Sequence, residues 1–427
     1  MQNRVQKKKK ISLTTMIFIA LLAGALAGVI INYVIPSNYV VDDIIVQGVF
    51  YIVGHGFIRL MRMLVVPLVF CSIVCGSMAV GDTKKLGSVG VKTLIFYLCT
   101  TALAITVALT IANIFNPGKG LDMSQIQVTS TVSETTQSMS MTETLLDIIP
   151  VNIFNSLSEG NMLQIIVFAL ILGVILANMG DRVDIVKNFF GQFNDIMMEM
   201  TMAVMKLAPI GVFCLIAKTF AEIGFEVFIP LLKYMFCVLL ALAVQCFVVY
   251  LGLLKIFSGL NPFIFIKNFF PVMAFAFSTS TSNATIPMNI DTLAEKMGVS
   301  KKISSFTIPL GATINMDGTS IMQGVAVVFT AQAFGIPLDM MDYLTVIGTA
   351  TLASIGTAGV PSVGLITLTM VFNSVGLPIE GIALIMGIDR ILDMTRTAVN
   401  ITGDAVCTTI VASWNKAVDR DVYYRRK

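Results

Sequence analysis

The chain has 427 residues, of which 56% are hydrophobic and only 12% carry a charge, and its mean hydropathy is +0.87. Soluble globular domains have about 25% charged residues, so this composition excludes a soluble protein and indicates one that lies in a bilayer. The formal net charge of +3 is too small to indicate a nucleic-acid partner.

The first half of the sequence predicts ordinary membrane-spanning helices. A hydrocarbon core about 30 Å thick requires roughly 20 apolar residues for each helix. With the apolar segments of the second half, we predict eight spans and two further stretches that are too polar in the middle to cross. The predicted spans of the first half cover residues 13–35, 48–79, 94–114, 162–177, 197–217 and 227–257.

The basic residues predict the orientation of the chain, because cytoplasmic loops of membrane proteins are enriched in Lys and Arg. One basic run precedes the first predicted span, another follows the second span, and a third ends the chain. We therefore predict a multi-pass protein of the plasma (inner) membrane with both termini in the cytoplasm. The three groups are residues 7–10, residues 84, 85 and 92, and residues 425–427.

Two segments in the second half break the rules for spanning helices. Residues 274–290 and 350–368 are apolar at their flanks, but small polar residues and a proline interrupt each of them. Irregular backbone at membrane depth is tolerated only where it is buried in protein or lines a water-filled cavity. Paired interruptions indicate a transporter binding site, and the predicted topology makes the two segments enter from opposite sides as an inverted repeat.

The last apolar segment carries a stripe of polar side chains. At about 100° per residue, its members fall within an arc of roughly 80° on one helix face. A charge at the bilayer centre costs at least about 2.5 kcal/mol, so several on one face indicate ligands or partners. The stripe consists of Asp389, Asp393, Arg396, Asn400 and Asp404.

Negative charge exceeds positive charge in this region. Three aspartates accompany one arginine in the stripe, and Asp317 adds a fourth acid from the preceding apolar segment. Hard cations prefer carboxylate and carbonyl oxygens, so we expect bound cations to neutralise the excess. A substrate with an ammonium and a carboxylate group suits Asp393 and Arg396, because a guanidinium binds a carboxylate through two hydrogen bonds.

Four motifs in this order resemble the family of glutamate transporters and dicarboxylate/amino-acid:cation symporters over nearly the whole chain. They are NMLQIIVFA at residues 161–169, NMDGT at 315–319, SIGTAGVP at 354–361 and DMTRTAVNITGD at 393–404. The resemblance implies an all-α integral membrane protein with eight transmembrane helices and two re-entrant hairpins. It also implies a homotrimer of elevator-type transporters, each with a scaffold (about 11–80 and 145–222) and a mobile transport domain (about 88–116 and 227–417).

The resemblance implies a binding site for an amino acid. Asp393 is expected to bind the substrate ammonium and Arg396 the side-chain carboxylate. Gly359 and Val360, at the tip of the second hairpin, are expected to close over the substrate. The main-chain carboxylate and its surroundings are assigned to Ser282, Thr319, Thr397 and Asn400.

The resemblance also implies three sodium sites. Asp404 is expected to bind the first ion together with backbone oxygens near Gly311, Asn315 and Asn400. The second site is assigned to Tyr97, Thr100, Thr101, Asn315 and Asp317, and the third to Thr313 with the carbonyl groups of Ser354, Ile355 and Thr357. Because all the expected side chains are present, we expect sodium rather than proton coupling. No pairing of a nucleophile with a base is visible within the predicted spans, so we do not expect an enzyme.

Two departures from the family pattern leave the substrate open. Relatives that carry amino acids usually place an arginine beside the binding aspartate, where this chain has Ser280 and Met394. Aspartate or glutamate is the expected substrate, with cystine or a neutral amino acid as alternatives. A proton symporter of the same fold is a further alternative. A C4-dicarboxylate carrier is the remaining one, although a dicarboxylate has no ammonium for Asp393 to bind.

Overall fold

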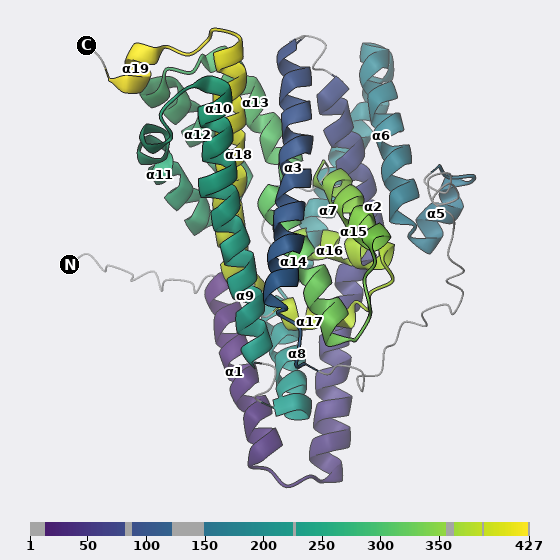
Figure 1. Ribbon diagram of the computed structural model, residues 1–427. Helices are drawn as coiled ribbons and strands as arrows, with labels where there is room; N and C mark the ends of the chain where they lie inside the picture. The colour runs from purple at the N-terminus through teal and green to yellow at the C-terminus, as the bar shows by residue number, and fades with distance from the viewer. Residues whose placement is uncertain are drawn as a thin grey trace, which may run out of the picture.

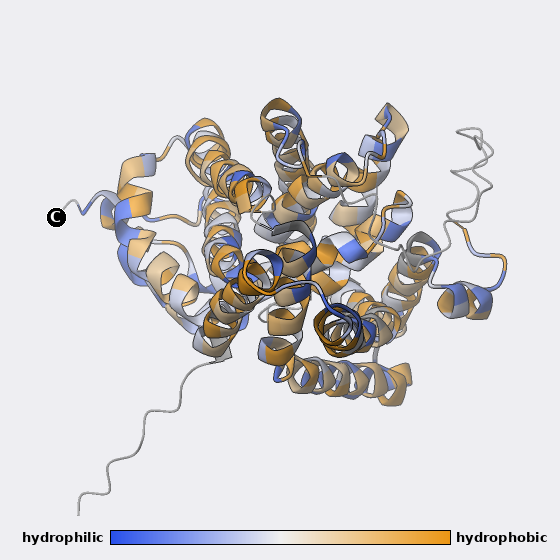
Figure 2. Cartoon of the chain, turned by 90° about the horizontal axis from the view of Figure 1, so that it is seen from below, coloured by the Kyte–Doolittle hydropathy of each residue, from blue (hydrophilic) through white to orange (hydrophobic). Residues whose placement is uncertain are grey.

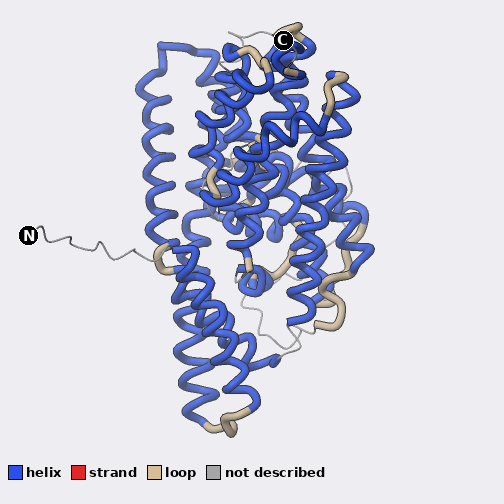
Figure 3. Tube along the Cα trace, turned by 90° about the vertical axis from the view of Figure 1, so that its left-hand side faces the viewer, coloured by secondary structure: helices blue, strands red, loops and turns tan. Residues whose placement is uncertain are grey.

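The computed structural model describes residues 13–81, 88–121, 149–224, 228–355, 363–386 and 388–425. Nearly all of these residues are helical, as Figure 3 shows. Within them, the only β pairing is an isolated bridge between Val299 and Val418. The prediction of an all-α protein is confirmed for the described part of the chain.

The helices of the first half, apart from α3, form one group. α1 runs along α8, and α2 contacts α6, α7 and α8 (Figure 1). Close approach of α1 to α8 depends on Gly24 and Gly28, where an added Cβ would collide with the α8 backbone. This spacing of two glycines is typical of tight helix pairs in membranes. The bounds are α1 (Leu13–Tyr33), η1 (Val40–Phe50), α2 (Tyr51–Gly81), α5 (Ile153–Glu159), α6 (Met162–Met179), η3 (Gly180–Val183), α7 (Asp184–Met205) and α8 (Ala208–Ile223).

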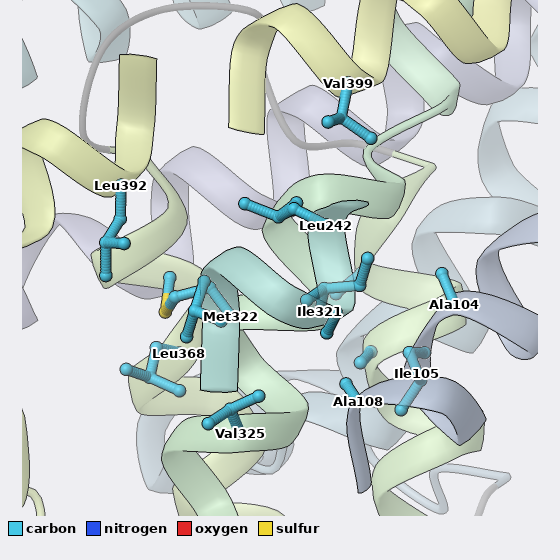
Figure 4. Close-up of a cluster of buried hydrophobic side chains, with 14 of the residues drawn as sticks. Ala104, Ile105, Ala108, Leu242, Ile321, Met322, Val325, Leu368, Leu392 and Val399 are labelled. Carbon is cyan, nitrogen blue, oxygen red and sulfur yellow. The ribbon is translucent and has the colours of Figure 1, made fainter. Parts of the chain in front are cut away.

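The remaining helices pack around α14 and α18. Figure 4 shows buried apolar side chains from α3, α9, α14, α16 and α18 meeting in one cluster. The bounds are α3 (Ser88–Phe115), α9 (Phe228–Ala243), η5 (Val244–Tyr250), α10 (Leu251–Ser258), α11 (Pro262–Thr279), α12 (Ser282–Met297), α13 (Lys301–Ile314), α14 (Asp317–Ala333), α15 (Met340–Ser354), α16 (Val363–Ser374), α17 (Glu380–Met386), α18 (Asp389–Trp414) and α19 (Arg420–Tyr424).

Both interrupted segments form pairs of helices in contact with each other. α11 ends and α12 begins around Ser280, which adopts a left-handed conformation with φ 52°. α15 packs against α16, and residues 356–362 between them lie outside the described part of the chain. The first pair lies nearer the end of the molecule that holds the C-terminus than the second (Figure 1). The predicted interruption of the first segment is confirmed.

A third break separates α13 from α14. Asn315 and Met316 have φ and ψ of −90° and 91°, and −115° and 43°, which lie outside the helical region. Both residues are buried, with exposed fractions of 1% and 3%. This backbone lies inside protein, which is where irregular backbone is tolerated at membrane depth.

Length and composition identify five helices among the described residues as long and apolar enough to cross a membrane. The number is six if the bent pair of segments that includes α7 and α8, with an angle of 52°, counts as one span. Apolar residues, orange in Figure 2, make up much of the helices, and many of their large side chains are exposed. These findings agree with a multi-span membrane protein, while the number of eight spans stays a prediction.

Candidate functional site

The polar stripe lies on one continuous helix, α18, and all five of its members are buried. The structure divides the stripe into two parts. Asp389, Asp393 and Arg396 interact with one another near the beginning of the helix. Asn400 and Asp404 lie further along and bond to the break between α13 and α14.

The first part of the stripe is a chain of alternating charges. Arg396 Nη1 donates to Asp389 Oδ1 at 2.7 Å, and its Nη2 donates to Asp393 Oδ1 at 2.8 Å. Arg390 Nη1 donates to the other oxygen of Asp393, Oδ2, at 3.3 Å. Two carboxylates and two guanidinium groups therefore balance in charge.

Arg390 was missed from the sequence because it lies outside the arc of the stripe. Its position three residues before Asp393 was the available signal, since side chains at this spacing meet on a helix. The excess of negative charge inferred from the sequence is therefore smaller than expected. It falls on Asp317 and Asp404, for which the described residues provide no ion pair.

Asp317, the first residue of α14, accepts three hydrogen bonds from neutral groups. Thr101 Oγ1 lies 2.6 Å from Oδ1, and Tyr250 Oη and Gln245 Nε2 lie 2.7 and 3.1 Å from Oδ2. Thr100 contributes its carbonyl group, which accepts from the same Gln245 amide at 3.4 Å. Asp317 has no measurable exposure. The expected approach of Thr100 and Thr101 to Asp317 is thus observed.

Gln245 and Tyr250 are members of this cluster that the sequence did not predict. Both lie in or at the end of η5, a π-helical segment of an otherwise apolar span, and both are fully buried. π-Helical turns occur frequently at functional sites because they redirect side chains. Two polar residues inside an apolar span were the signal in the sequence.

Asp404 occupies a second neutral environment. Asn315 Nδ2 donates to Asp404 Oδ1 at 2.8 Å and lies 3.2 Å from the Asn400 carbonyl oxygen. Gly311 lies against the same carboxylate, because a Cβ at this position would collide with Asp404 Oδ1 and Tyr97 Oη. Four of the residues expected at the first two cation sites therefore surround Asp404.

Two neutral oxygens in these clusters have no hydrogen-bond donor. Asn315 Oδ1 and Gln245 Oε1 are buried and unpartnered among the described residues. An unpartnered buried acceptor is costly, so both oxygens are available to a ligand. The described residues contain no group of three or more His, Cys, Asp or Glu side chains of the kind that binds transition metals. Carboxylates with nearby neutral oxygens are the ligands that hard cations prefer.

The other residues assigned to the substrate lie on α18 and on the helices that pack against it. Asn400 Oδ1 accepts from the Gly318 amide at 2.7 Å, and Thr397 Oγ1 donates to the Asp393 carbonyl at 2.8 Å. Thr319 lies under the beginning of α16, where a Cβ at Gly364 would lie 2.9 Å from Thr319 Cγ2 and 3.5 Å from Arg396 Nη2. The second hairpin therefore reaches the charged part of the stripe.

Ser282 begins α12 and is buried, with its carbonyl group accepting from Thr285 Oγ1 at 2.6 Å. α12 is joined to α18 through Asn289 Nδ2, 3.5 Å from the Ile401 carbonyl oxygen. The first hairpin therefore packs on the helix that carries the stripe, and the role of Ser282 stays a prediction.

Three members of the third expected cation site lie in the described part of the chain, and each contacts a neighbouring backbone. Thr313 Oγ1 donates to the Leu310 carbonyl at 2.8 Å, and Ser354 Oγ donates to the Thr351 carbonyl at 2.8 Å. The Ile355 carbonyl faces Gly76 of α2, where a Cβ would collide with it. The remaining members, Thr357, Gly359 and Val360, lie outside the described residues.

Comparison with known proteins gives a family match over nearly the whole chain. Residues 13–414 match the model of the sodium:dicarboxylate symporter family. The chain is 40% identical over 411 residues to a proton/sodium-glutamate symport protein of Bacillus caldotenax, with 95% of each chain covered.

Two other relatives carry different names. A proton/glutamate-aspartate symporter of Escherichia coli is 36% identical over 422 residues, covering 97% of this chain and 95% of the relative. C4-dicarboxylate transport protein 1 of Ralstonia nicotianae is 33% identical over 372 residues, covering 86% of both. The family match spans nearly the whole chain, including every residue of the buried clusters described above. This membrane protein therefore belongs to the sodium:dicarboxylate symporter family.

Proposed function

We propose that this protein is a secondary active symporter that imports aspartate or glutamate and is driven by sodium. The observation that carries the proposal is the contrast between two groups of buried charges, the paired group at the beginning of α18 and the acidic group of Asp317 and Asp404. Asp389, Asp393, Arg390 and Arg396 balance one another, whereas Asp317 and Asp404 are buried with neutral partners only. We assign the coupling ions to the acidic group, and a substrate with an ammonium and a carboxylate to the paired group.

Sodium suits the acidic group of Asp317 and Asp404 better than a proton does. A proton needs one carboxylate oxygen, whereas a hard cation needs several oxygen ligands around it. Asn315 Oδ1 and Gln245 Oε1 supply neutral oxygens that have no donor of their own. The protein therefore holds more acceptor groups here than a proton would use. Asp404 with Asn315 is assigned to one ion, and Asp317 with Thr101 to another.

An acidic amino acid suits the paired group at the beginning of α18. Arg396 Nε is buried and has no acceptor among the described residues, so its N–H is left for a substrate carboxylate together with the second N–H of each terminal nitrogen. Asp393 lies beside it and provides the negative charge that an ammonium group needs. Gly318, Thr319 and Thr397 surround the same region with small or hydroxyl-bearing groups.

The proposed mechanism follows the arrangement of the helices. The scaffold comprises α1 to α8 without α3, at about residues 11–80 and 145–222. The transport domain comprises α3 and the helices from α9 onward, at about 88–116 and 227–417. Contact between the two is made mainly through α2 with α16 and α8 with α17, and to a smaller extent through α2 with α13 and α6 with α15 and α16. In this proposal the transport domain moves as an elevator against the scaffold. The protein forms a homotrimer in the plasma (inner) membrane, with both termini in the cytoplasm.

The alternatives differ in the substrate or in the coupling ion. The names of the relatives include proton coupling and C4-dicarboxylates. A C4-dicarboxylate offers no ammonium to Asp393, and cystine or a neutral amino acid offers a weaker partner to Arg396 or none. Competition by aspartate, glutamate, cystine, serine and succinate, measured on uptake into proteoliposomes, distinguishes them. Inhibition by aspartate and glutamate alone supports the proposal, and inhibition by succinate alone contradicts it.

Asp393→Asn is expected to weaken binding of aspartate by about tenfold, because the substrate ammonium loses a charged partner. Binding of sodium without substrate should stay measurable, since Asp317 and Asp404 are untouched. Isothermal titration of the purified protein with aspartate and with sodium separates the two effects. If Asp393→Asn binds succinate better than the unmodified protein and neither binds aspartate, the substrate is a dicarboxylate.

Gly311→Ala is expected to raise the sodium concentration for half-maximal uptake about tenfold. The new methyl group would collide with Asp404 Oδ1 and Tyr97 Oη, and overpacking of this kind costs about 1–3 kcal/mol. Gly252→Ala of α10 is the matched control, because a Cβ there meets nothing within 4 Å. Equal sodium responses of the two variants would show that Gly311 does not border an ion site.

A further inference from the structure

A groove on the outer side of α3 lies apart from the charged stripe of α18, and Thr100 of the Asp317 cluster forms part of its inner wall. It has a volume of about 360 Å³, which lies within the range of about 300–1,000 Å³ of ligand pockets. Its walls are almost entirely apolar, and the only charged residue among them is Lys92. The wall residues that matter here are Lys92, Ile95, Cys99 and Leu103 of α3, Phe257 of α10 and Trp414 of α18.

The groove faces away from the protein core. The side chains of Ile95, Leu103, Phe257 and Trp414 are exposed by 57%, 41%, 46% and 41%. In a multi-span membrane protein, such an apolar outer face meets the hydrocarbon of the bilayer. The natural occupant of this groove is therefore an acyl chain.

The length of the groove agrees with one leaflet. Lys92 lies near the beginning of α3, and the ends of α10 and α18 lie at the same end of the molecule (Figure 1). From Lys92 to Leu103 the helix rises about 16 Å at about 1.5 Å per residue. This rise is about half of a hydrocarbon core about 30 Å thick.

The charge of Lys92 identifies the headgroup. Lys92 has no hydrogen bond or ion pair within the described residues, although it is only partly exposed. Acyl chains alone give little selectivity, because lipid tails are as apolar as the leucine side chains they contact. A lysine at the membrane surface attracts an anionic lipid, so the headgroup must supply the preference.

We propose that the groove binds one anionic phospholipid, with its phosphate at Lys92 and an acyl chain along Cys99 and Leu103. Trp414 forms one wall, and its Nε1 donates to the Phe257 carbonyl at 3.2 Å. The inner wall includes Thr100, next to Thr101, which donates to Asp317. The lipid therefore packs on the outer side of the turn of α3 that borders the proposed cation site.

The single tryptophan of the chain is a direct reporter of this site. The full-length protein is reconstituted in phosphatidylcholine vesicles that contain increasing fractions of brominated phosphatidylglycerol or brominated phosphatidylcholine. Bromine atoms near the indole quench the fluorescence of Trp414. We expect phosphatidylglycerol to quench at a mole fraction on the order of fivefold lower than phosphatidylcholine does, because one lysine contributes about that preference.

Three variants test the role of Lys92. Lys92→Gln should lose the headgroup preference and Lys92→Arg should keep it. The matched control Lys255→Gln should also keep it, because Lys255 is on α10 but does not line the groove. Equal quenching by the two lipids in the unmodified protein, or an unchanged preference in Lys92→Gln, overturns the proposal. Absence of quenching by either lipid also overturns it, because the groove is then covered by protein, for example a second copy.

Discussion

Arg396→Cys is expected to lower the uptake of aspartate and glutamate on the order of 100-fold while uptake of neutral amino acids is kept or gained. The guanidinium group offers charge-assisted hydrogen bonds, each worth about 1.5–3 kcal/mol, to a substrate carboxylate. A neutral side chain receives no such bonds and loses nothing when Arg396 is removed. Uptake of labelled aspartate and serine by the same proteoliposomes gives the two values.

The charge chain complicates this experiment, because Arg396 also pairs with Asp389 and Asp393. Removing one partner of a buried ion pair leaves an uncompensated charge and costs about 3–5 kcal/mol of stability. Arg396→Cys alone is therefore expected to lower the melting temperature as well as transport.

The double variant Arg396→Cys/Asp389→Asn separates stability from recognition. It removes the carboxylate that has no partner other than Arg396 among the described contacts, so thermal stability should recover in part. Uptake of aspartate should stay low, because no guanidinium group has returned at this position. A folded double variant in which serine and aspartate uptake fall equally would show that Arg396 only holds the structure together.

Much of this architecture follows from the sequence because the bilayer restricts the choices of the chain. Apolar length predicted α1, α3 and the span from α9 to α10, and the interruption around Ser280 predicted the break between α11 and α12. In each case a local property of the sequence decides the outcome. A segment without water around it must satisfy its backbone groups internally, which makes helices obligatory.

The composition of the site is harder to predict from the sequence, because side-chain partners depend on the packing of distant helices. The arc of α18 identified Asp393, Arg396 and Asp404, but Gln245 and Tyr250 reach Asp317 from a helix more than sixty residues earlier. A π-helical segment, which no simple periodicity predicts, directs these side chains. Arg390 was likewise overlooked, since a contact between neighbouring turns does not require the same helix face.

Asp404→Asn is expected to remove about one sodium ion from the dependence of transport on sodium. The change keeps the shape of the side chain but removes its charge, and the described residues give Asp404 no basic partner to compensate. If the proposed sites are all used, the unmodified protein should couple roughly two to three sodium ions to each substrate molecule. Asp291→Asn is the control, because Asp291 is exposed and its ion pair in the described structure is with Lys301.

The experiment measures aspartate affinity at rising sodium concentrations at fixed pH, and at varying pH with fixed sodium. Substrate and ion must tighten each other by the same factor, because coupling between two sites is reciprocal. Affinity that rises steeply with sodium in the unmodified protein, and less steeply in Asp404→Asn, supports sodium coupling through this carboxylate. Affinity that ignores sodium but follows pH contradicts it, and then Asp317 and Asp404 carry protons in a symporter of the same fold.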